Sequence, residues 1–380
     1  MKKILILSDS LDIRGGADKV ALQHFNFLSK HSNVRFLTTK AKEVITTDPA
    51  ISFIYPYKHA FYNFLKNICN LKFNSRLSKV LEMFNPDEVI IHSFTKQISP
   101  IIFFGLSKFK TSIVMHDYFL VCPNGGMFNY KTSKQCNLKG GSISCALTNC
   151  DKYSYAVKIF RLFRFYVQSL GVRFLNPKIY YFNNFQKKYL TSHSFNQKFR
   201  YANEIFRLYK INKNYLAKNY LVYIGRGDKE KGVMVFKDTS LKIPFKLAFF
   251  GFYDKNIAFN FKDAKFFDWS TEDKISIFLR EKCRVGIFPS VWLEADPLVP
   301  WEMMRHNIPV VSFRYNVFGQ FLSKILPELV FVNTKELNDI LINLTDDSYY
   351  KKIVTKVRVF YQNELTKRDV VSSNFYKKFI

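Results

Sequence analysis

A strand, a polar loop and a helix follow one another at two places in this chain, and that recurrence most limits its fold. The first instance has an apolar run at residues 4–7 and helical spacing over 17–28. The second has an apolar run at residues 220–224, a Gly-Arg-Gly turn and a helix predicted over 231–236. Short apolar runs bounded by turn residues are typical of buried parallel strands. The sequence therefore predicts two α/β halves, each with a parallel sheet.

Further short strands are expected in both halves. They are predicted at residues 34–37, 88–91, 111–115, 246–250, 284–288 and 308–313. Two of these runs are followed by or end near a histidine, His92 and His116, and parallel sheets bind ligands at the carboxyl ends of their strands. We divide the chain into an N-terminal domain (1–203), a linker (204–219), a C-terminal domain (220–362) and a helical segment (363–380) that returns to the N-terminal domain.

The charge of the chain is strongly positive and uneven. The formal net charge is +28, and residues 101–200 alone carry 15 basic and 2 acidic side chains. Such a field attracts nucleic acid, anionic lipid head groups or phosphorylated substrates. The apolar run after Met1 is too short for a signal peptide, and no stretch is long enough to span a membrane. We expect a cytoplasmic protein whose six cysteines are reduced.

Residues 225–232, Gly-Arg-Gly-Asp-Lys-Glu-Lys-Gly, form the first motif with a chemical meaning. They lie between a predicted strand and a predicted helix, where free backbone N–H groups and the helix dipole favour an anion. Arg226 adds a planar fork and Lys231 a point charge, and both suit a diphosphate. The alternative is a surface turn whose charges are solvated.

A second motif contains two carboxylates, Glu294 and Glu302. Asp296-Pro297 interrupts any helix between them, so Glu294 belongs to a loop and Glu302 to the start of a helix predicted over 301–306. Two such carboxylates would accept hydrogen bonds from sugar hydroxyls at the two ends of one ligand. Alternatively, Glu302 is a first-turn acid that complements the helix dipole.

Together these motifs resemble the C-terminal half of family 4 retaining glycosyltransferases of the bacterial surface-polysaccharide type. The resemblance is carried by the order and spacing of residues 223–233, 288–302 and 309–311. In the N-terminal half, Gly15-Gly16 and His116-Asp117-Tyr118 fit it as well. It implies the GT-B fold, in which two Rossmann-like α/β domains face each other across a cleft. The C-terminal domain of such enzymes holds a nucleotide sugar, UDP-, GDP- or dTDP-linked, and the N-terminal domain binds the acceptor.

The resemblance implies how the donor is bound. Arg226 and Lys231 match positions that neutralise the leaving diphosphate, and the backbone amides of Leu298 and Val299 match the loop that completes its cradle. Glu302 matches the residue that binds the ribose hydroxyls. Fixed cations would then replace a divalent ion at the leaving group. In agreement, the sequence has no Asp-x-Asp motif for a catalytic metal, and no cofactor is expected.

The resemblance also implies which residues lie at the reacting centre. Glu294 matches a residue beside the transferred sugar, and His116 one that reaches the donor sugar near the reacting carbon. Gly15 and Gly16 match a turn where the backbone meets phosphate or acceptor, although a simple helix-capping turn explains them too. Retaining transfer by this fold needs no protein nucleophile. Asp296-Pro297 replaces a more usual Phe-Gly, and Gln320 lies where an acidic residue is usual.

Four cysteines follow His116 within a short stretch: Cys122, Cys136, Cys145 and Cys150. Only the spacing of Cys145 and Cys150 is close to that of a zinc half-site. One hypothesis is a structural Cys₄ zinc that holds an insertion on the acceptor side. The other is a set of reduced, partly buried thiols.

Residues 155–170 are predicted to form an amphipathic helix. Lys158, Arg161 and Arg164 fall on one arc, opposite an apolar arc. The basic arc would rest on an anionic membrane leaflet beside a lipid-linked acceptor. Alternatively, the helix packs on the core with its basic side in water.

We therefore expect a metal-independent retaining glycosyltransferase that moves a hexose-type sugar to a lipid-linked glycan in O-antigen, capsule or lipopolysaccharide biosynthesis. It would be peripheral on the inner face of the cytoplasmic membrane. The alternatives are a basic nucleic-acid-binding protein and a GT-B enzyme of other chemistry, such as a sugar-nucleotide epimerase. The 41 Phe and 22 Tyr are spread through predicted strands and helices, unlike an exposed nucleic-acid platform, so no nucleic-acid partner is expected.

Overall fold

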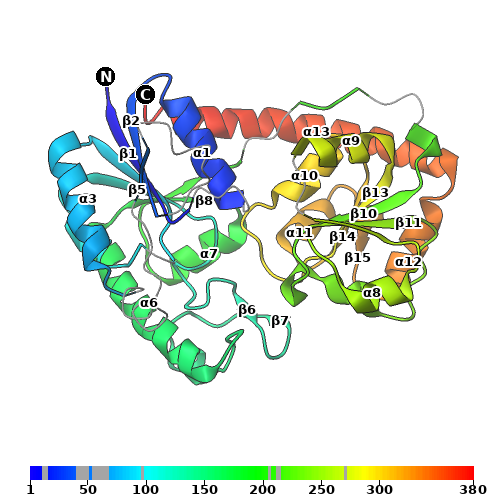
Figure 1. Ribbon diagram of the computed structural model, residues 1–380, viewed down its shortest axis with the longest axis horizontal. Coiled ribbons are helices and arrows are strands. Elements are labelled where there is room, and N and C mark those ends of the chain that lie inside the picture. The colour runs from blue at the N-terminus through cyan, green and yellow to red at the C-terminus, as the bar shows by residue number, and fades with distance from the viewer. Residues whose placement is uncertain are drawn as a thin grey trace. The chain divides into compact units, whose positions relative to one another are not determined.

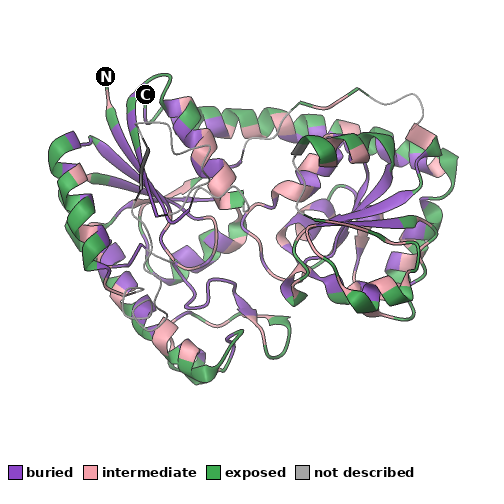
Figure 2. Cartoon of the chain, viewed as in Figure 1, coloured by how far each residue is buried: buried purple, intermediate pink, exposed green. Residues whose placement is uncertain are grey.

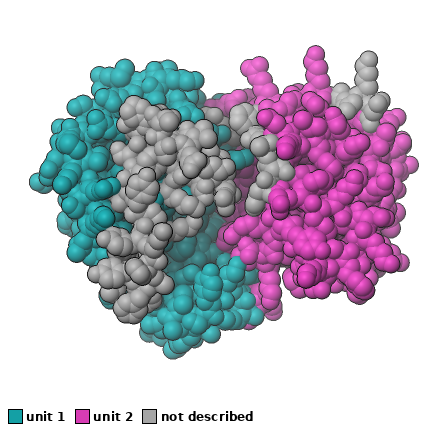
Figure 3. All heavy atoms as spheres, in the orientation of Figure 1, with its two compact units in different colours: residues 1–131, 136–203, 370–380 teal, residues 132–135, 204–369 magenta. Residues whose placement is uncertain are grey.

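A computed structural model describes residues 1–10, 16–39, 51–53, 68–95, 98–203, 207–210, 215–268 and 272–380. The chain forms two compact units (Figure 3). Unit 1 comprises Met1–Lys131, Cys136–Asn203 and Val370–Ile380, and unit 2 comprises Thr132–Gln135 and Glu204–Asp369. Each unit is built around one parallel sheet.

The sheet of unit 1 has seven strands in the order β3-β2-β1-β4-β5-β8-β9. Every neighbouring pair is parallel. The strands are β1 (Lys3–Ser8), β2 (Asn33–Thr38), β3 (Ile51–Phe53), β4 (Glu88–Ser93), β5 (Lys110–Val114), β8 (Lys178–Tyr181) and β9 (Lys198–Arg200). The connection reverses direction between β1 and β4, and ligands bind at the carboxyl ends of strands beside such a switch point.

Helices lie on both sides of this sheet (Figure 1). They are α1 (Gly16–Leu28), α3 (Leu71–Phe84), α4 (Ile102–Gly105), α5 (Ile143–Leu147), α6 (Tyr155–Leu175) and α7 (Asn184–Ser192). The end of α13 (Asp347–Tyr376) also belongs to unit 1 and packs beside α1, where the rings of Phe27 and Tyr376 stack 3.9 Å apart. A separate two-stranded sheet joins β6 (Phe128–Asn129) and β7 (Lys134–Gln135).

The sheet of unit 2 has six strands in the order β12-β11-β10-β13-β14-β15, again all parallel. The strands are β10 (Tyr220–Ile224), β11 (Lys246–Phe250), β12 (Lys265–Phe267), β13 (Cys283–Phe288), β14 (Val310–Phe313) and β15 (Val330–Phe331). Every residue of β10 and β13 is buried. The prediction of two parallel α/β halves is confirmed, and each predicted strand lies on an observed one.

The remaining elements of unit 2 surround this sheet (Figure 1). They are the helices α8 (Lys255–Asn260), α9 (Glu272–Glu281), α10 (Leu298–Met304), α11 (Val317–Leu322), α12 (Thr334–Asn343) and most of α13, with the 3₁₀ turns η2 (Tyr215–Ala217), η3 (Lys229–Lys231), η4 (Val233–Lys237) and η5 (Pro327–Leu329). Among the described residues, no helix is both long and apolar enough to cross a membrane.

Two predictions about local structure in unit 2 are wrong. The α-helix expected over 231–236 is replaced by η3 and η4, which Gly232 separates with a φ of 78°. A Cβ atom on Gly232 would lie 1.9 Å from the carbonyl oxygen of Pro289, so only glycine lets the two loops pass so closely. The helix expected over 301–306 begins earlier, at Leu298, directly after Pro297.

Helix α6 faces the opposite way from both expectations for residues 155–170. Lys158 and Arg164 are buried, whereas a row of apolar side chains faces solvent. Figure 2 shows that buried and exposed residues alternate along α6. This row, the α6 stripe, consists of residues that are 39–64% exposed: Tyr155, Ile159, Phe163, Tyr166, Leu170 and Phe174. Leu162 and Phe165 face the core instead. The expectation of a solvated basic face is wrong because the interior supplies acceptors for these cations.

Candidate functional site

Two loops of unit 2 meet at the carboxyl ends of β10 and β13, the adjacent strands at which the strand order reverses. The backbone N–H of Val291 donates to the carbonyl of Glu230 at 3.0 Å, and the hydroxyl of Ser290 donates to the same oxygen at 3.3 Å. These bonds tie the loops together and bring Lys231 beside Glu294, with 2.8 Å between Nζ and Oε1.

Both members of this pair are held by further contacts. Oε1 of Glu294 also accepts hydrogen bonds from Oγ of Ser290 at 2.9 Å and from Nε1 of Trp292 at 3.1 Å. The ammonium of Lys231 lies 5.2 Å from the centre of the Trp292 ring, within the range of a cation–π contact. The side chains of Lys231 and Glu294 remain 20% and 14% exposed. The arrangement offers a fixed cation and a carboxylate acceptor that a ligand can still reach.

Arg226 lies in the same loop but has a different partner. Among the described residues its guanidinium pairs with Asp228, at 3.1 Å, rather than with Glu294. The side chain is 55% exposed. Its carbonyl accepts a 2.8 Å hydrogen bond from the hydroxyl of Tyr223, whose pKa is raised chiefly by burial. The structure thus places Arg226 at the same sheet edge as Lys231 without joining the two in one contact.

Helix α10 carries the other three donor-side candidates. Leu298 and Val299 are its first two residues, and N–H groups in a first turn have no partner within the helix. Glu302 lies one turn further along and is half-buried. The alternative that Glu302 is a first-turn acid is wrong, because the helix begins earlier than predicted.

Asp296, one of the departures from the family pattern, has a structural partner. Both carboxylate oxygens accept from the guanidinium of Arg368 in α13, at 2.7 and 3.0 Å. That guanidinium also lies 4.3 Å from the centre of the Trp301 ring. A bidentate pair over an aromatic face fixes the segment that leads into α10.

Asn316 is a residue of this region that the sequence analysis missed. It is fully buried and caps α11, where Oδ1 accepts from the N–H of Gly319 at 2.7 Å. Its amide nitrogen donates to the carbonyl of Ser290 at 2.9 Å, which supports the loop that carries Glu294. Gln320, noted as a departure, donates to the carbonyl of Tyr315 at 3.0 Å. The Asn three residues before a glycine at a helix start is the signal that could have revealed this cap.

In unit 1, His116 lies directly after β5 and belongs to a chain of rings. Its Nε2 is 2.9 Å from Nδ1 of His92, and Nε2 of His92 is 3.1 Å from Nδ1 of His24. Nε2 of His24 is 2.7 Å from the hydroxyl of Tyr201. Burial lowers the pKa of His116 to about 3 and, with the neighbouring imidazoles, holds those of His92 and His24 well below the usual value. All three are neutral near pH 7.

A carboxylate cluster lies at the same edge of this sheet. Burial raises the pKa of Asp117 to about 6, against the opposing effects of the Phe119 N–H bond and of Arg164, while Asp9 raises it further. Asp9 follows β1 and accepts from the N–H of Ile98 at 2.7 Å. Gly16, a predicted site residue, is the first residue of α1. Gly15 lies outside the described residues.

Two of the four clustered cysteines contact the buried amine of Lys158. Nζ of Lys158, fully buried, lies 3.1 Å from Sγ of Cys150 and 3.3 Å from Sγ of Cys145. Burial acts to lower the pKa of Lys158, but the contacts with the two cysteines outweigh it and the pKa is raised. Within the described residues, no group of three or more His, Cys, Asp or Glu side chains could hold a metal ion.

The zinc hypothesis for Cys122, Cys136, Cys145 and Cys150 stays a prediction, which this geometry does not favour. The cation beside the sulfur atoms is the ammonium of Lys158, and all six cysteines are free thiols. Burial raises the pKa of Cys122 to about 12 and also raises that of Cys136. The described contacts are those expected for the alternative, a set of reduced and partly buried thiols.

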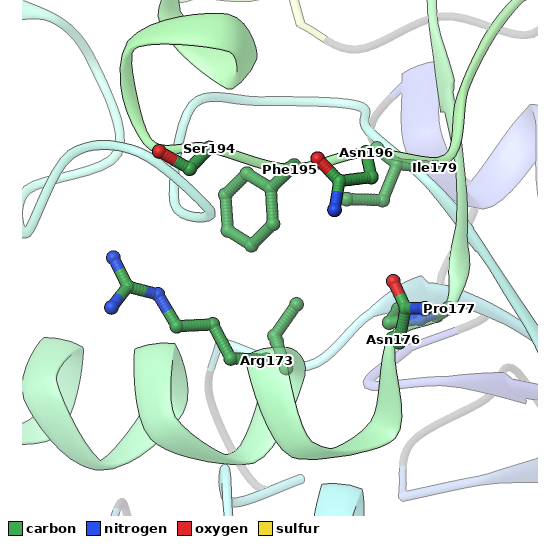
Figure 4. A pocket seen from close by; sticks show the side chains of 8 residues that line it. Arg173, Asn176, Pro177, Ile179, Ser194, Phe195 and Asn196 are labelled. Carbon is green, nitrogen blue, oxygen red and sulfur yellow. The ribbon is translucent and has the colours of Figure 1, made fainter.

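A pocket of about 290 Å³ lies elsewhere in unit 1 (Figure 4). Its walls come from the end of α6, the start of β8 and the segment after α7, and Arg173, Ser194 and Phe195 line it. The pocket is at the amino end of β8, whereas His116 follows the carboxyl end of β5. It is not part of the candidate site.

No protein-family model matches the chain, and no curated protein matches it. Solved structures of similar fold match nearly its whole length. Sucrose-phosphate synthase from Thermosynechococcus elongatus is 15% identical with a TM-score of 0.72, covering 100% of this chain and 99% of its own. WaaG, a glycosyltransferase involved in lipopolysaccharide biosynthesis, is 13% identical with a TM-score of 0.66, covering 97% and 99%. HepE from Anabaena, in complex with UDP and glucose, is 11% identical with a TM-score of 0.68, covering 99% and 100%.

Sequence identities this low establish the fold and nothing finer. The strand order of each sheet, with its reversal beside the first strand, is that of a Rossmann-like domain. The chain has the GT-B glycosyltransferase fold, with one such domain in each unit.

Proposed function

We propose that this protein is a glycosyltransferase that moves a sugar from a nucleoside-diphosphate donor to a glycan acceptor. The observation that carries the proposal is the contact between Lys231 and Glu294 at the switch point of the second sheet. A sugar nucleotide needs a cation for its diphosphate and acceptors for its hydroxyls, and this pair supplies one of each. HepE, of similar fold, was crystallised with UDP and glucose.

On the donor side, Lys231 neutralises the departing diphosphate, and Arg226 approaches it from the exposed part of the same loop. The first-turn amides of Leu298 and Val299 complete the cradle, and Glu302 accepts from the ribose hydroxyls. Positive charge that is already in place costs no reorganisation when the leaving group departs. We therefore propose that transfer does not require a divalent ion.

At the reacting carbon, we propose transfer with retention of configuration. The bond from carbon to the phosphate oxygen breaks, and a bond to the acceptor oxygen forms on the same face. The proton of the acceptor hydroxyl passes to the leaving phosphate oxygen. Glu294 positions the transferred sugar, which we propose to be a hexose, and His116 reaches the sugar near the reacting carbon. No side chain acts as a nucleophile.

The acceptor is proposed to be lipid-linked, and the α6 stripe supports this. Six large apolar side chains occupy one face of a helix that contains no acidic residue, and Ile143 and Leu147 of the adjoining α5 are 81% and 75% exposed. Exposed apolar rows of this kind mark interaction sites. The surrounding residues 101–200 carry 15 basic and 2 acidic side chains, which suits an anionic membrane surface. The apolar stripe, not the basic arc, would enter the lipid.

We also propose that the protein belongs to family 4. It would act in O-antigen, capsule or lipopolysaccharide synthesis at the inner face of the membrane. The acceptor would bind unit 1 and the nucleotide sugar unit 2. These assignments depend on the motifs at 223–233 and 288–302 and on the membrane-directed stripe.

A release assay tests the proposed activity. Purified protein is incubated with UDP-, GDP- and dTDP-sugars, a bacterial lipid extract and EDTA, and both nucleoside diphosphate and glycolipid are measured. We expect stoichiometric formation of both in the presence of chelator. Isomerisation of the donor without release of nucleoside diphosphate would indicate an epimerase. Strict dependence on Mn²⁺ would contradict the proposal that transfer does not require a divalent ion.

A further inference from the structure

Four side chains of unit 1 form one continuous hydrogen-bonded chain. It runs from Tyr201, after β9, through His24 on α1 and His92 on β4 to His116, after β5. Tyr201, His24 and His92 are at most 2% exposed, whereas His116 is only partly buried. The chain therefore links the interior of the unit to the sheet edge at which ligands are expected.

Simple proton counting leaves this chain two arrangements. A neutral imidazole donates through one ring nitrogen and accepts through the other, and burial keeps all three rings neutral near pH 7. Each ring nitrogen inside the chain faces another member. Either every member donates toward Tyr201, or every member donates toward His116. In the first case Nδ1 of His116 is an acceptor, and in the second it carries a proton.

The distances favour donation toward His116. Tyr201 and His24 are separated by 2.7 Å, whereas the ring nitrogens are 3.1 and 2.9 Å apart. Hydrogen bonds given by a hydroxyl are shorter than those given by a ring N–H, so the phenol of Tyr201 is the donor at the first link. His24 then donates from Nδ1 to His92, and His92 donates from Nδ1 to His116.

We infer that Tyr201, His24 and His92 hold His116 in the tautomer that carries its proton on Nδ1. His116 then presents a donor to its ligand, and within the described residues Nδ1 has no protein partner. The inference rests on the proposed function for the identity of that ligand, an oxygen of the donor sugar or of the acceptor. A histidine with a proton on Nδ1 cannot take the proton of the acceptor hydroxyl there, so that proton is left to the leaving phosphate. His24 and His92 are positioning residues.

The end of α13 closes the interior end of the chain. The ring of Phe375 lies 4.7 Å from that of His24 and 4.6 Å from that of Tyr201. Tyr376 packs edge-on against His24 at 5.5 Å. These three ring contacts pack the end of α13 against the interior end of the hydrogen-bonded chain.

Nitrogen-15 NMR of histidine-labelled protein reads the tautomer directly, and His116→Gln identifies the signals of His116. We expect a protonated-type shift at Nδ1 and an unprotonated-type shift at Nε2. In Tyr201→Phe, loss of the first donor should move both shifts toward the average of the two tautomers. Tyr180→Phe is the matched control, because its phenol is equally buried, at 1% exposure, and lies outside the chain. A proton on Nε2, or shifts that Tyr201→Phe leaves unchanged, would overturn the inference.

Kinetics supply an independent arm through two variants of His92. The amide nitrogen of Asn can occupy the place of Nδ1 and still donate to His116, whereas Leu cannot. We expect His92→Asn to retain kcat within about threefold and His92→Leu to lose about tenfold or more, with little change in the donor KM. Equal losses in both would overturn the positioning role. The NMR arm needs no turnover, so the expected spectrum in a protein without transferase activity would refute the proposed function and still support the tautomer assignment.

Discussion

Nζ of Lys231 lies 2.8 Å from Oε1 of Glu294, although 63 positions separate the two residues in the chain. The contact exists because β10 and β13 are neighbours in the sheet and both loops leave their carboxyl ends. A cation held in this way acts on a leaving group without first having to be oriented. It is the part of the site on which the proposed chemistry most depends.

Replacing this cation should reduce turnover of the donor. We expect Lys231→Ala to lower kcat by roughly 10² to 10³, as is typical when one charge stabiliser of a transition state is removed. Lys229→Ala is the matched control, since Lys229 lies in the same turn and is exposed. Release of nucleoside diphosphate from the best donor measures both. Equal activity in the two variants would remove Lys231 from the mechanism.

Gly232 should tolerate no side chain. Because its φ is 78° and a Cβ atom would meet the carbonyl of Pro289, we expect Gly232→Ala to lower the free energy of unfolding by at least about 2 kcal/mol. Gly105→Ala is the control, because nothing lies within 4 Å of a Cβ there, and it should be neutral or slightly stabilising. Urea denaturation compares them. A neutral Gly232→Ala would mean that the two loops are not so closely packed.

The fold should lose stability when the solution is acidified below about pH 6.5. His24, His92 and His116 have lowered pKa values in the folded state, so the unfolded chain binds more protons below that pH and acid favours unfolding. Each group contributes about 1.4 kcal/mol per pH unit.

Two other groups modify the dependence of the free energy of unfolding on pH. Burial lowers the pKa of His306 to about 4, which adds to the loss, while Asp117, with its pKa raised to about 6, opposes it. The net slope below pH 6 is then about 4 kcal/mol per unit. Denaturation midpoints at about pH 7, 6 and 5 measure it, and stability that rises on acidification would contradict the buried, neutral chain.

The α6 stripe should bind anionic membranes. We expect Phe163→Ser with Leu170→Ser to reduce the fraction of protein that floats with phosphatidylglycerol vesicles about tenfold, because two buried apolar side chains are lost from the lipid. Leu71→Ser with Met83→Ser is the control. These residues are 70% and 74% exposed on α3 of the same unit. Equal effects of the two pairs would remove α6 as the membrane-binding face.

Chelation should leave the cysteine cluster intact. Because Lys158 provides the cation beside Cys145 and Cys150, we expect purified protein to contain zinc well below one ion per chain. Its thermal unfolding should be unchanged by EDTA. Elemental analysis and differential scanning calorimetry check this, and one tightly bound zinc per chain would contradict it.

Local apolar patterns were enough to predict both sheets, since runs such as 220–224 and 246–250 become buried parallel strands. The motifs assigned both Lys231 and Glu294 to one donor ligand but did not predict the direct contact between them. Other features depend on contacts that periodicity cannot show. The helix over 231–236 fails because of the backbone conformation of Gly232. Helix α6 turns its cations inward because two sulfur atoms, the carbonyl of Phe94 and the side-chain oxygen of Gln168 lie there.

The histidine chain illustrates a further limit. His92 was noted at a strand end, but His24 and Tyr201 come from distant segments and are joined only by the fold. Asp117 likewise gains its raised pKa from burial, which depends on packing rather than on neighbouring residues in the sequence.

Binding of a ligand at the proposed donor site should change the fluorescence of Trp292. Its indole donates to Glu294 and stacks near the Lys231 ammonium, and it is half-buried, whereas Trp301 is enclosed in the core. A nucleotide that draws the ammonium away changes the surroundings of Trp292, one of three tryptophans in the chain, and leaves those of the enclosed Trp301 unchanged. Occupancy of the site can therefore be followed by intrinsic emission, without a label and before any bond is made or broken.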